Sequence, residues 1–321
     1  MKDLSQLHEI LDKAINTIHY PKSPDQLYSP IKYIMGLSGK RMRPLLLLMS
    51  YQLFDDNIEK AISPALAIEL FHNFTLLHDD IMDNAPLRRG KRTVHEKWNN
   101  NVAILSGDVM MIKAYELLSK VEPKYLKSIL NVFNKAAVEV CEGQQWDMDF
   151  ETNEKVTLVE YIKMIKYKTA VLLAASLRIG AIISDSKVED QDHLYEFGIN
   201  MGIAFQLKDD LLDVFGNSDI FGKKIGGDIL SNKKTFLYLK ALQISDPSTS
   251  LLLKGHYRNH DQTELKVEKV KNIFVELNIK KHTIDIMKAY YTKAMKHLDA
   301  IDSQKKSPLI IFSNKLMQRD Y

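Results

Sequence analysis

The chain has 321 residues and a mass of 36.9 kDa, a length that allows one large domain or two ordinary ones. Hydrophobic residues make up 45% and charged residues 26%, which is typical of a globular protein and excludes a mostly disordered chain. A net charge of only +3 gives no support to nucleic-acid binding. The single cysteine excludes an intramolecular disulfide and a zinc site built from several cysteines.

Targeting and membrane-spanning signals are absent from the sequence. The first 20 residues are amphipathic and carry acidic side chains, so they lack the apolar core of a signal peptide. The most apolar stretch, residues 169–183, is interrupted by Arg178 and is shorter than the roughly 20 residues that a spanning helix needs. We therefore expect a soluble, cytoplasmic protein with no transmembrane segment and no nucleic-acid partner.

Apolar residues recur at helical spacing along most of the chain, beginning with Leu4, Leu7, Ile10 and Leu11. In chain order this pattern predicts helices over 4–18, 44–54, 58–83, 101–120, 122–149, 157–183, 188–214, 231–243, 261–278 and 281–301, with a glycine-containing loop at 216–227. Few or no strands are expected, because no short β-branched run alternates with polar residues. Long helices with short connections favour an all-α bundle.

Two aspartate-rich motifs give the strongest chemical signal. HDDIMD contains Asp79, Asp80 and Asp83, and KDDLLD contains Asp209, Asp210 and Asp213. In a helix the first and third aspartates of each triplet share a face. Three carboxylates within two turns repel one another unless a cation binds, and Mg²⁺ prefers one or two carboxylates together with water and substrate phosphates. Two such clusters facing each other would make a site for a diphosphate bridged by Mg²⁺.

A solvated acidic helix face is the alternative interpretation of a single triplet. Both triplets, however, have apolar neighbours, in FHNFTLLHDDIMD and MGIAFQLKDDLLDVF, and an exposed face would carry more polar residues. Basic residues cluster at three further places, in GKRMRP, in RRGKR directly after the first triplet, and in FGKKIGGDILSNKKT after the second. Arginine and lysine bind phosphate oxygens well, so the pattern favours a substrate with several phosphate charges.

Six motifs in this order resemble those of the trans-isoprenyl diphosphate synthases, also called polyprenyl synthetases. They are GKRMRP, HDDIMDNAPLRRG, GQQWDM, KYKTA, FQLKDDLLD and GKKIGGDILSNKKT, and they span residues 39–235. The resemblance implies one all-α domain over residues 1–321, of the isoprenoid synthase type, with a deep central cavity. It also implies a homodimer and about three Mg²⁺ ions per site.

The reaction that the resemblance implies joins isopentenyl diphosphate head to tail to an allylic diphosphate (dimethylallyl, geranyl or farnesyl), giving an all-trans prenyl diphosphate. Diphosphate leaves under electrostatic stabilisation by Mg²⁺ and basic side chains. The double bond of isopentenyl diphosphate attacks the allylic cation, and a proton is lost to the departing diphosphate. No nucleophilic side chain is required, so Cys141 is expected in the core and His78 has no assigned role.

Individual roles follow from the same resemblance. The metal ligands are expected to be Asp79, Asp80, Asp83 and Asp209, supported by Asp210 and Asp213. The allylic diphosphate is expected on Arg88, Lys168, Lys224 and Lys233, and isopentenyl diphosphate on Lys40, Arg43, His72 and Arg89. Thr169 and Gln206 are expected to line the carbocation, with Gln144 and Asp147 near the metals. Lys208 departs from the smaller or neutral residue usual before the second triplet and is expected to point outward.

Product length is expected to depend on residues that precede the first triplet. Phe74 and Thr75 lie five and four residues before Asp79, and Phe71 shares a face with Phe74. One helical turn rises 5.4 Å, close to the length of one isoprene unit, so an aromatic ring one turn below the metals should stop elongation early. In the family, an aromatic residue at the fifth position alone suggests a twenty-carbon product, geranylgeranyl diphosphate. Farnesyl diphosphate, with fifteen carbons, is the second possibility, and a purely structural role for Phe71 and Phe74 is the alternative.

Three other interpretations are weighed against a synthase. A terpene cyclase has a similar fold, but it needs no second substrate site and carries a different second metal motif. A non-catalytic subunit of a heteromeric longer-chain prenyl synthase would lack the triplets. A purely structural helical protein would have no reason to bury six aspartates. The two intact triplets, GKRMRP and Arg89 favour the synthase.

Overall fold

The computed structural model describes residues 2–216, 225–259 and 263–318, and within these residues the fold is almost entirely helical. The only strands in the described ranges are β1 (Leu87–Arg88) and β2 (Lys91–Arg92), which form one antiparallel hairpin. The expectation of an all-α fold is therefore confirmed. Chain contacts group the residues into two compact units, and the single domain expected over residues 1–321 stays a prediction.

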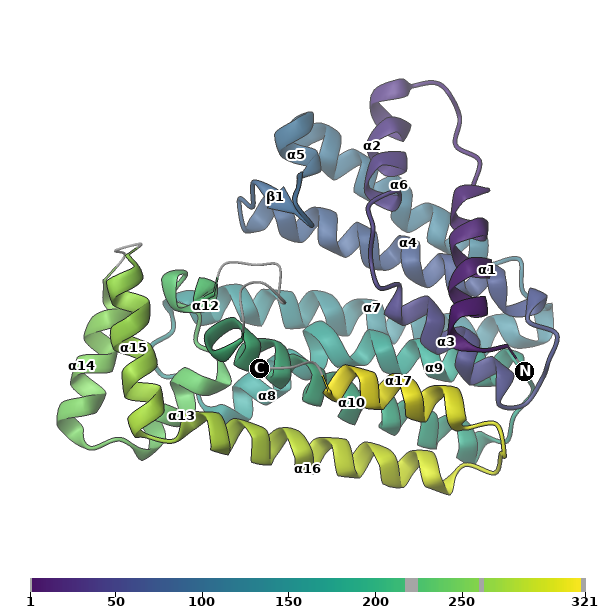
Figure 1. The fold of residues 1–321 in the computed structure, drawn as a ribbon. Helices are drawn as coiled ribbons and strands as arrows, with labels where there is room; N and C mark the ends of the chain where they lie inside the picture. The colour runs from purple at the N-terminus through teal and green to yellow at the C-terminus, as the bar shows by residue number, and fades with distance from the viewer. Residues whose placement is uncertain (1, 217–224, 260–262, 319–321) are drawn as a thin grey trace. The chain divides into compact units, whose positions relative to one another are not determined.

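The first unit comprises residues 1–133, 176–192 and 302–309. Its helices are α1 (Leu4–Asn16), α2 (Asp25–Met35), α3 (Met42–Gln52), α4 (Glu59–Met82), α5 (Val94–Lys97) and α6 (Asn100–Leu118), with the first part of α7 (Pro123–Thr152). Figure 1 shows α4 and α6 lying side by side, and they make the most extensive helix pair in this unit. Helix α4 is apolar almost all round, as expected for a helix at the centre of a bundle.

The second unit comprises residues 134–175, 193–301 and 310–321. Its elements are the rest of α7, α8 (Leu158–Ile165), the π-turn η1 (Lys166–Ala170), most of α10 (Val188–Phe215), α12 (Gly227–Leu230), α13 (Phe236–Ile244), α14 (Pro247–Arg258), α15 (Glu264–Glu276) and α16 (Ile279–Ala300). Helices α9 (Val171–Ile183) and α17 (Ser307–Met317) contribute residues to both units. In Figure 1, α14 and α15 run beside each other and α13 lies against α16.

The KYKTA motif forms η1, a π-turn that interrupts the single helix predicted over 157–183. Two glycines allow neighbouring helices to reach it. A Cβ added at Gly143 of α7 would lie 2.3 Å from the backbone nitrogen of Lys168, and one added at Gly202 of α10 would lie 2.5 Å from Ala170. Such π-turns within α-helices often occur at functional sites, and this one carries Lys168 and Thr169.

The long predicted helices are present, with small differences at their ends. Helix α3 begins at Met42, before Pro44, because proline fits anywhere in the first turn, where backbone N–H groups lack helical partners. Five described helices were not predicted: the short α5 and α12, and the longer α2, α14 and α17. Each of the three longer ones begins in a segment with proline and serine or aspartate that the hydrophobic pattern treated as loop. Most of the loop predicted at 216–227 lies outside the described residues.

Two predictions about individual residues are wrong. Lys208 does not point outward: it is 1% exposed, and its Nζ donates a hydrogen bond of 2.7 Å to the carbonyl oxygen of Met317, at the end of α17. Cys141 is exposed on α7 and not in the core. No helix in the described ranges has the length and apolar character needed to cross a bilayer.

Candidate functional site

The first aspartate triplet occupies the last turn of α4. Asp83 is the C-terminal cap, and its backbone nitrogen donates to the carbonyl oxygen of Asp79. A helix C-terminus carries partial negative charge, so three carboxylates there are unfavourable without nearby cations. The side chains differ in exposure: Asp80 is buried, Asp79 is half-buried and Asp83 is exposed. The triplet is thus not buried as a group, contrary to the sequence argument.

Arg88 supplies the cation for the buried member of this triplet. Its Nε donates to both carboxylate oxygens of Asp80 at 2.8 Å, and its Nη2 lies 2.7 Å from Oδ1. Fork-like contact of a guanidinium with a carboxylate is the strong form of this ion pair. Arg88, expected to bind the allylic diphosphate, therefore contacts an aspartate that was assigned to the metal.

The hairpin that carries Arg88 turns through Arg89 and Gly90, with φ values of 53° and 73°. Two consecutive residues with positive φ are the mark of a type I′ turn, which matches the twist of the flanking strands. Glycine adopts this conformation without strain, whereas the hairpin geometry holds Arg89, a residue with a side chain, in a slightly strained backbone conformation. The turn sends the two adjacent arginines to different partners: Arg88 contacts Asp80 at the end of α4, and Arg89 contacts Leu37 and Gly39 before α3.

Three of the four residues predicted for isopentenyl diphosphate come together in the first unit. Arg43 Nη1 lies 3.0 Å from His72 Nε2. The guanidinium of Arg89 rests on Gly39, where an added Cβ would lie 2.5 Å from Nη1, and it contacts the carbonyl oxygen of Leu37 at 3.4 Å. Lys40, the fourth, is exposed in the loop beside Gly39.

The electrostatics of this basic group follow from burial and mutual repulsion. Burial lowers the pKa of Arg43 to about 10, with a further lowering by Arg89 that Glu69 and Asp79 oppose, so Arg43 stays charged at neutral pH. Burial also lowers the pKa of His72 well below its usual value, and Arg43 and Arg89 add to this effect. His72 is therefore neutral and acts as a hydrogen-bonding group beside two arginines.

A buried ion pair supports this region and was not anticipated from the sequence. Arg41 Nη1 lies 2.6 Å from Glu69 Oε1, and Asn73 Nδ2 donates to the same carboxylate oxygen at 2.9 Å. Arg41 also donates to the carbonyl oxygens of Met35 and Leu37. It thereby fixes the loop before α3, and hence the residues that precede Arg43. The only available signal was an acidic residue in the otherwise apolar segment of α4.

The three residues predicted to set product length, Phe71, Phe74 and Thr75, all lie on α4. Phe71 is 1% exposed and packs edge-on against Phe133, with ring centroids 5.0 Å apart. Phe74 is half-buried, 5.7 Å from Phe71 and 4.7 Å from His78, between ring centroids. Thr75 donates its hydroxyl to the carbonyl oxygen of His72. Phe71 is a core residue, whereas Phe74 is the more accessible ring nearer the triplet.

The second triplet lies near the C-terminal end of α10, and again only its middle member is buried. Asp210 accepts a very short hydrogen bond from the hydroxyl of Tyr161 and a bond of 3.1 Å from Gln206 Nε2. Burial raises the pKa of Asp210 to about 8, and the nearby carboxylate of Asp228 contributes. Both donors to Asp210 are neutral; Gln206 lies one turn earlier on the same helix, whereas Tyr161 is 49 residues away in the sequence.

The π-turn contributes Lys168 and Thr169 to the second cluster. Lys168 Nζ pairs with Asp147 Oδ2 at 2.5 Å, and Thr169 donates its hydroxyl to Gln206 Oε1 at 3.1 Å. Because Gln206 in turn donates to Asp210, a hydrogen-bonded row runs from the π-turn to the second triplet. Thr169 and Gln206 are thus in contact, Asp147 is paired with the neighbouring Lys168, and Gln144 is a buried residue of α7.

Asp213 has a structural partner that the sequence did not reveal. Its Oδ2 accepts a hydrogen bond of 3.0 Å from the backbone nitrogen of Asp228, and its carbonyl oxygen accepts one of 2.7 Å from Gly226. These bonds fix the start of α12 against the third member of the triplet. The backbone nitrogen of Lys233 then donates to the carbonyl oxygen of Asp228 at 2.9 Å. Lys233 is exposed, and Lys224 lies outside the described residues.

Both clusters have the donor chemistry that suits Mg²⁺. Carboxylate oxygens are its preferred protein ligands, and each triplet lies toward a helix C-terminus, where a cation is favourable. The buried carboxyl of Asp210 has acids and neutral donors around it, so a cation would favour its ionised form. Among the described residues, no three acidic, histidine or cysteine side chains converge as a ready-made metal cage.

Comparison with known proteins gives one consistent result. The family model described as polyprenyl synthetase matches residues 24–274. Over 314 residues the chain is 35% identical to a protein of Methanosarcina mazei named geranylgeranyl diphosphate synthase, covering 97% of this chain and 95% of that protein.

Solved structures give the same picture. One crystal structure of a geranylgeranyl pyrophosphate synthase matches with a TM-score of 0.95 and 43% identity, covering 100% of both chains. A polyprenyl synthase from Caulobacter crescentus, solved with calcium and isoprenyl diphosphate, matches with a TM-score of 0.88 and 26% identity, covering 99% of this chain and 96% of that one. The second of these proteins binds a divalent cation together with a prenyl diphosphate.

Proposed function

The chain belongs to the polyprenyl synthetase family, and we propose that it makes geranylgeranyl diphosphate by Mg²⁺-dependent condensation of isopentenyl diphosphate with an allylic diphosphate. Each addition breaks the bond between the allylic carbon and its diphosphate oxygen and forms one carbon–carbon bond. The electron pair for the new bond comes from the double bond of isopentenyl diphosphate. A proton is then lost to the released diphosphate, and a new double bond forms.

The observation that most supports this reaction is the group of Arg43, His72 and Arg89 in the same unit as the first triplet. A terpene cyclase has one diphosphate substrate and needs no such group. Arg43 is charged and His72 is neutral at pH 7. A diphosphate there gains charge-assisted hydrogen bonds from two guanidinium groups, together with a neutral hydrogen-bonding partner.

We assign the metal ligands to Asp79, Asp80 and Asp83 in one cluster and to Asp209 in the other, with Asp210 and Asp213 in support. When bound, Mg²⁺ supplies positive charge to the diphosphate as it leaves. The roles of this chain's own residues are distinct. Arg88, Lys168, Lys233 and Lys224 bind the allylic diphosphate, and Lys40 joins the isopentenyl diphosphate group. Thr169 and Gln206 line the allylic cation.

The product assignment rests on Phe74, a half-buried ring one turn before the triplet, followed by the small Thr75. A ring at that position limits the length of chain that fits along α4, and Thr75 leaves room that a second aromatic residue would fill. This supports twenty carbons, with fifteen as the second possibility. Phe71 packs on Phe133 and also contacts the ring of Phe74, whose position it helps to fix.

We further propose that the enzyme is a cytoplasmic homodimer. Helix α6 exposes Ile104, Leu105 and Ile112, which are 44%, 56% and 59% accessible. These residues recur at helical spacing and so form one apolar stripe, of the kind that a second copy of the chain covers in an oligomer. Light scattering after gel filtration should give twice the mass of the chain. Ile112→Lys should reduce that mass toward the monomer, whereas Val159→Lys, a change at another exposed apolar residue, should not.

Product analysis tests the reaction directly. The protein is incubated with Mg²⁺, isopentenyl diphosphate and, in separate samples, dimethylallyl, geranyl or farnesyl diphosphate, and the dephosphorylated alcohols are then separated by chromatography. We expect geranylgeraniol from all three starters and none in the presence of EDTA. A cyclic hydrocarbon, or failure to consume isopentenyl diphosphate with any starter, would show that the proposed function is wrong.

A further inference from the structure

A cavity in the second unit lies outside both aspartate clusters. It is open to solvent on one side, has a volume of about 440 Å³, and is lined by the C-terminal end of α7, the loop that follows it, the segment before α13, and helices α13 and α14. That volume falls in the range of roughly 300–1,000 Å³ that is usual for small-molecule sites. None of the residues assigned above to substrate or metal is among its lining residues.

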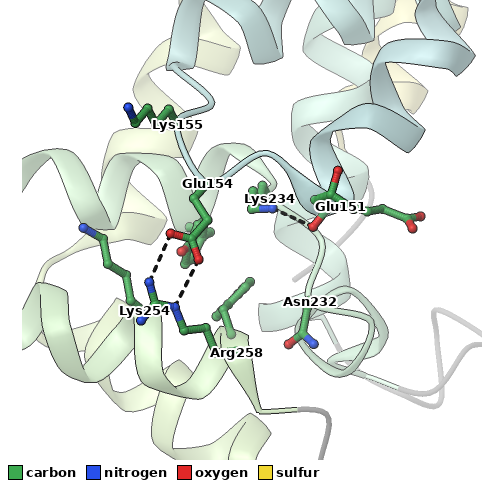
Figure 2. A pocket seen from close by; sticks show the side chains of 10 residues that line it. Glu151, Glu154, Lys155, Asn232, Lys234, Lys254 and Arg258 are labelled. Atoms are coloured by element: carbon green, nitrogen blue, oxygen red, sulfur yellow. Dashed lines mark hydrogen bonds and ion pairs between the residues drawn. The ribbon is translucent and has the colours of Figure 1, made fainter.

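The lining of this cavity is strongly basic. Its lining includes the four basic side chains of Lys155, Lys234, Lys254 and Arg258 and the two carboxylates of Glu151 and Glu154, which leaves a formal excess of two positive charges. Figure 2 shows these side chains around the Glu154–Arg258 ion pair. An excess of two charges matches one phosphate group, which carries roughly −1.5 to −2 near neutral pH.

Two of the lysines have no competing partner. The ammonium groups of Lys155 and Lys254 make no hydrogen bond or ion pair with any residue that the structure describes. Lys234 donates to the carbonyl oxygens of Phe150, at 2.5 Å, and Glu151, at 2.9 Å, and so keeps its third N–H. Arg258 uses Nε and Nη2 on Glu154 and keeps Nη1. The cavity therefore has several N–H donors to offer to one anion.

Two buried tyrosines add neutral donors. Tyr238 and Tyr257 are 5% and 8% exposed, and their rings stack with centroids 3.9 Å apart. Neither hydroxyl has a hydrogen-bond partner among the residues described. Burial raises the pKa of Tyr238 to about 12, and burial together with Asp228 raises that of Tyr257 well above its usual value. Both hydroxyls are therefore protonated at neutral pH and able to donate.

From this lining we infer that the cavity is an anion site for a phosphate monoester group, separate from the substrate sites. Phosphate has enough acceptor oxygens to bind lysine, arginine and tyrosine donors at once, and the volume leaves room for an attached organic part. The inference does not depend on the proposed prenyl transfer. Two sources share this chemistry: a soluble phosphate ester, and the headgroup of an anionic lipid. The second source is included because α14 exposes Leu251 and Leu252, 71% and 55% accessible, close to Lys254.

Calorimetric titration with inorganic phosphate in EDTA tests the site. The measurement is made in an Arg89→Gln background, so that the proposed isopentenyl diphosphate group does not contribute. We expect Lys254→Gln and Lys155→Gln each to weaken phosphate binding about tenfold, the effect of losing one charge-assisted hydrogen bond. Lys254→Arg keeps the positive charge and should retain most of the phosphate affinity. Lys269→Gln, which changes an exposed lysine of α15 away from the cavity, is the matched control.

A variant that is expected to bind phosphate more tightly provides a second test of the site. Glu154→Gln removes the carboxylate that occupies Arg258, so phosphate should bind more tightly. The two sources are separated by sedimentation with phosphatidic acid vesicles, with phosphatidylcholine vesicles as control. If free phosphate binds and Lys254→Gln weakens that binding, the ligand is a soluble phosphate ester. If only phosphatidic acid vesicles bind, and Lys254→Gln weakens that binding, the ligand is a lipid headgroup. The proposal is overturned if Lys254→Gln behaves as Lys269→Gln in both assays, or if Arg89→Gln by itself abolishes all binding.

Discussion

Asp80 in the first triplet and Asp210 in the second hold the same position in their motifs and are almost equally buried, at 2% and 3% exposed. Their partners differ. Asp80 is paired through three short contacts with the guanidinium of Arg88. Asp210 accepts hydrogen bonds from Tyr161 and Gln206, which are both neutral, and its pKa is raised to about 8 by burial and by the neighbouring acid Asp228.

This difference shows that equal spacing in the sequence does not give equal electrostatics in the fold. The first triplet lies at the end of α4, and a hairpin just after it returns an arginine to the buried carboxylate. The second triplet has Asp228 in the corresponding place, because the segment after α10 returns an acid. The carboxyl of Asp210 therefore needs an added cation in order to ionise at neutral pH.

Loss of a metal ligand should have the largest effect. Asp79→Ala and Asp209→Ala should each lower the Mg²⁺-dependent condensation rate by at least about 10²–10³-fold, because the leaving diphosphate loses electrostatic stabilisation. Helix content by circular dichroism should be unchanged. Asp12→Ala, at an exposed acid of α1, serves as control. Near-normal turnover in either variant would remove that triplet from the reaction.

Arg88→Ala should break the first cluster by leaving the carboxylate of Asp80 buried and unpaired. Removing one partner of a buried ion pair typically costs about 3–5 kcal/mol, and partial exposure of Arg88, 25% accessible, places the expected loss at the lower end. Urea unfolding in EDTA measures it. The double variant Arg88→Ala, Asp80→Asn should recover part of the loss. Equal stability of Arg88→Ala and the wild type would mean that Asp80 does not need this partner.

The pH dependence of stability should distinguish the second cluster. The pKa of Asp210 is raised in the folded protein above its usual value of 3.8. The protonated group therefore favours folding below about pH 4, and that advantage is lost as pH rises toward 8. At roughly 1.4 kcal/mol per pKa unit, the free energy of unfolding lost over this pH range is several kcal/mol.

The matching variant is Asp210→Asn, which has no proton to lose. In urea unfolding of metal-free protein, its stability relative to the wild type should increase between pH 4 and pH 8 and then level off. Parallel curves for the two proteins over that range would contradict the raised pKa.

Phe74→Ala should have the smallest effect on rate and a specific effect on product. The ring stands five residues before Asp79, whereas the residue five before Asp209 is the small Ala204. The nearest aromatic residue before the second triplet is Phe205, four residues before Asp209. We expect a product longer by at least one five-carbon unit, detected by chromatography, and little change for the control Phe205→Leu. An unchanged product would place the stop elsewhere.

Helical periodicity was sufficient to predict α4, α7 and α10, because their apolar faces are long and continuous. The triplets were recognisable because carboxylates crowd at helical spacing. Sequence could not supply the partners that come from distant segments: Tyr161 for Asp210, or the Met317 carbonyl that buries Lys208. The π-turn and the type I′ hairpin were missed for a related reason. Each depends on backbone geometry, and neither leaves a periodic pattern of side chains.

The expectation for the burial of Cys141 was wrong for a different reason. This cysteine was expected in the core because the reaction needs no nucleophilic side chain, but it is exposed on the same helix as Val138, which is 58% accessible. The two residues are three apart and so share a face of α7. Apolar character alone did not identify the buried side, since a long helix also carries apolar residues on its outer face.

Direct titration of the aspartate side chains tests the contrast between the two clusters most directly. In metal-free protein labelled with ¹³C at aspartate carboxyl groups, one resonance should titrate near pH 8 and should be absent from Asp210→Asn. Adding Mg²⁺ with inorganic diphosphate should shift that titration to lower pH, because a cation favours the ionised carboxylate. If no aspartate titrates above pH 6, or if Mg²⁺ and diphosphate leave the Asp210 titration unchanged, the second triplet is not the cation site described above.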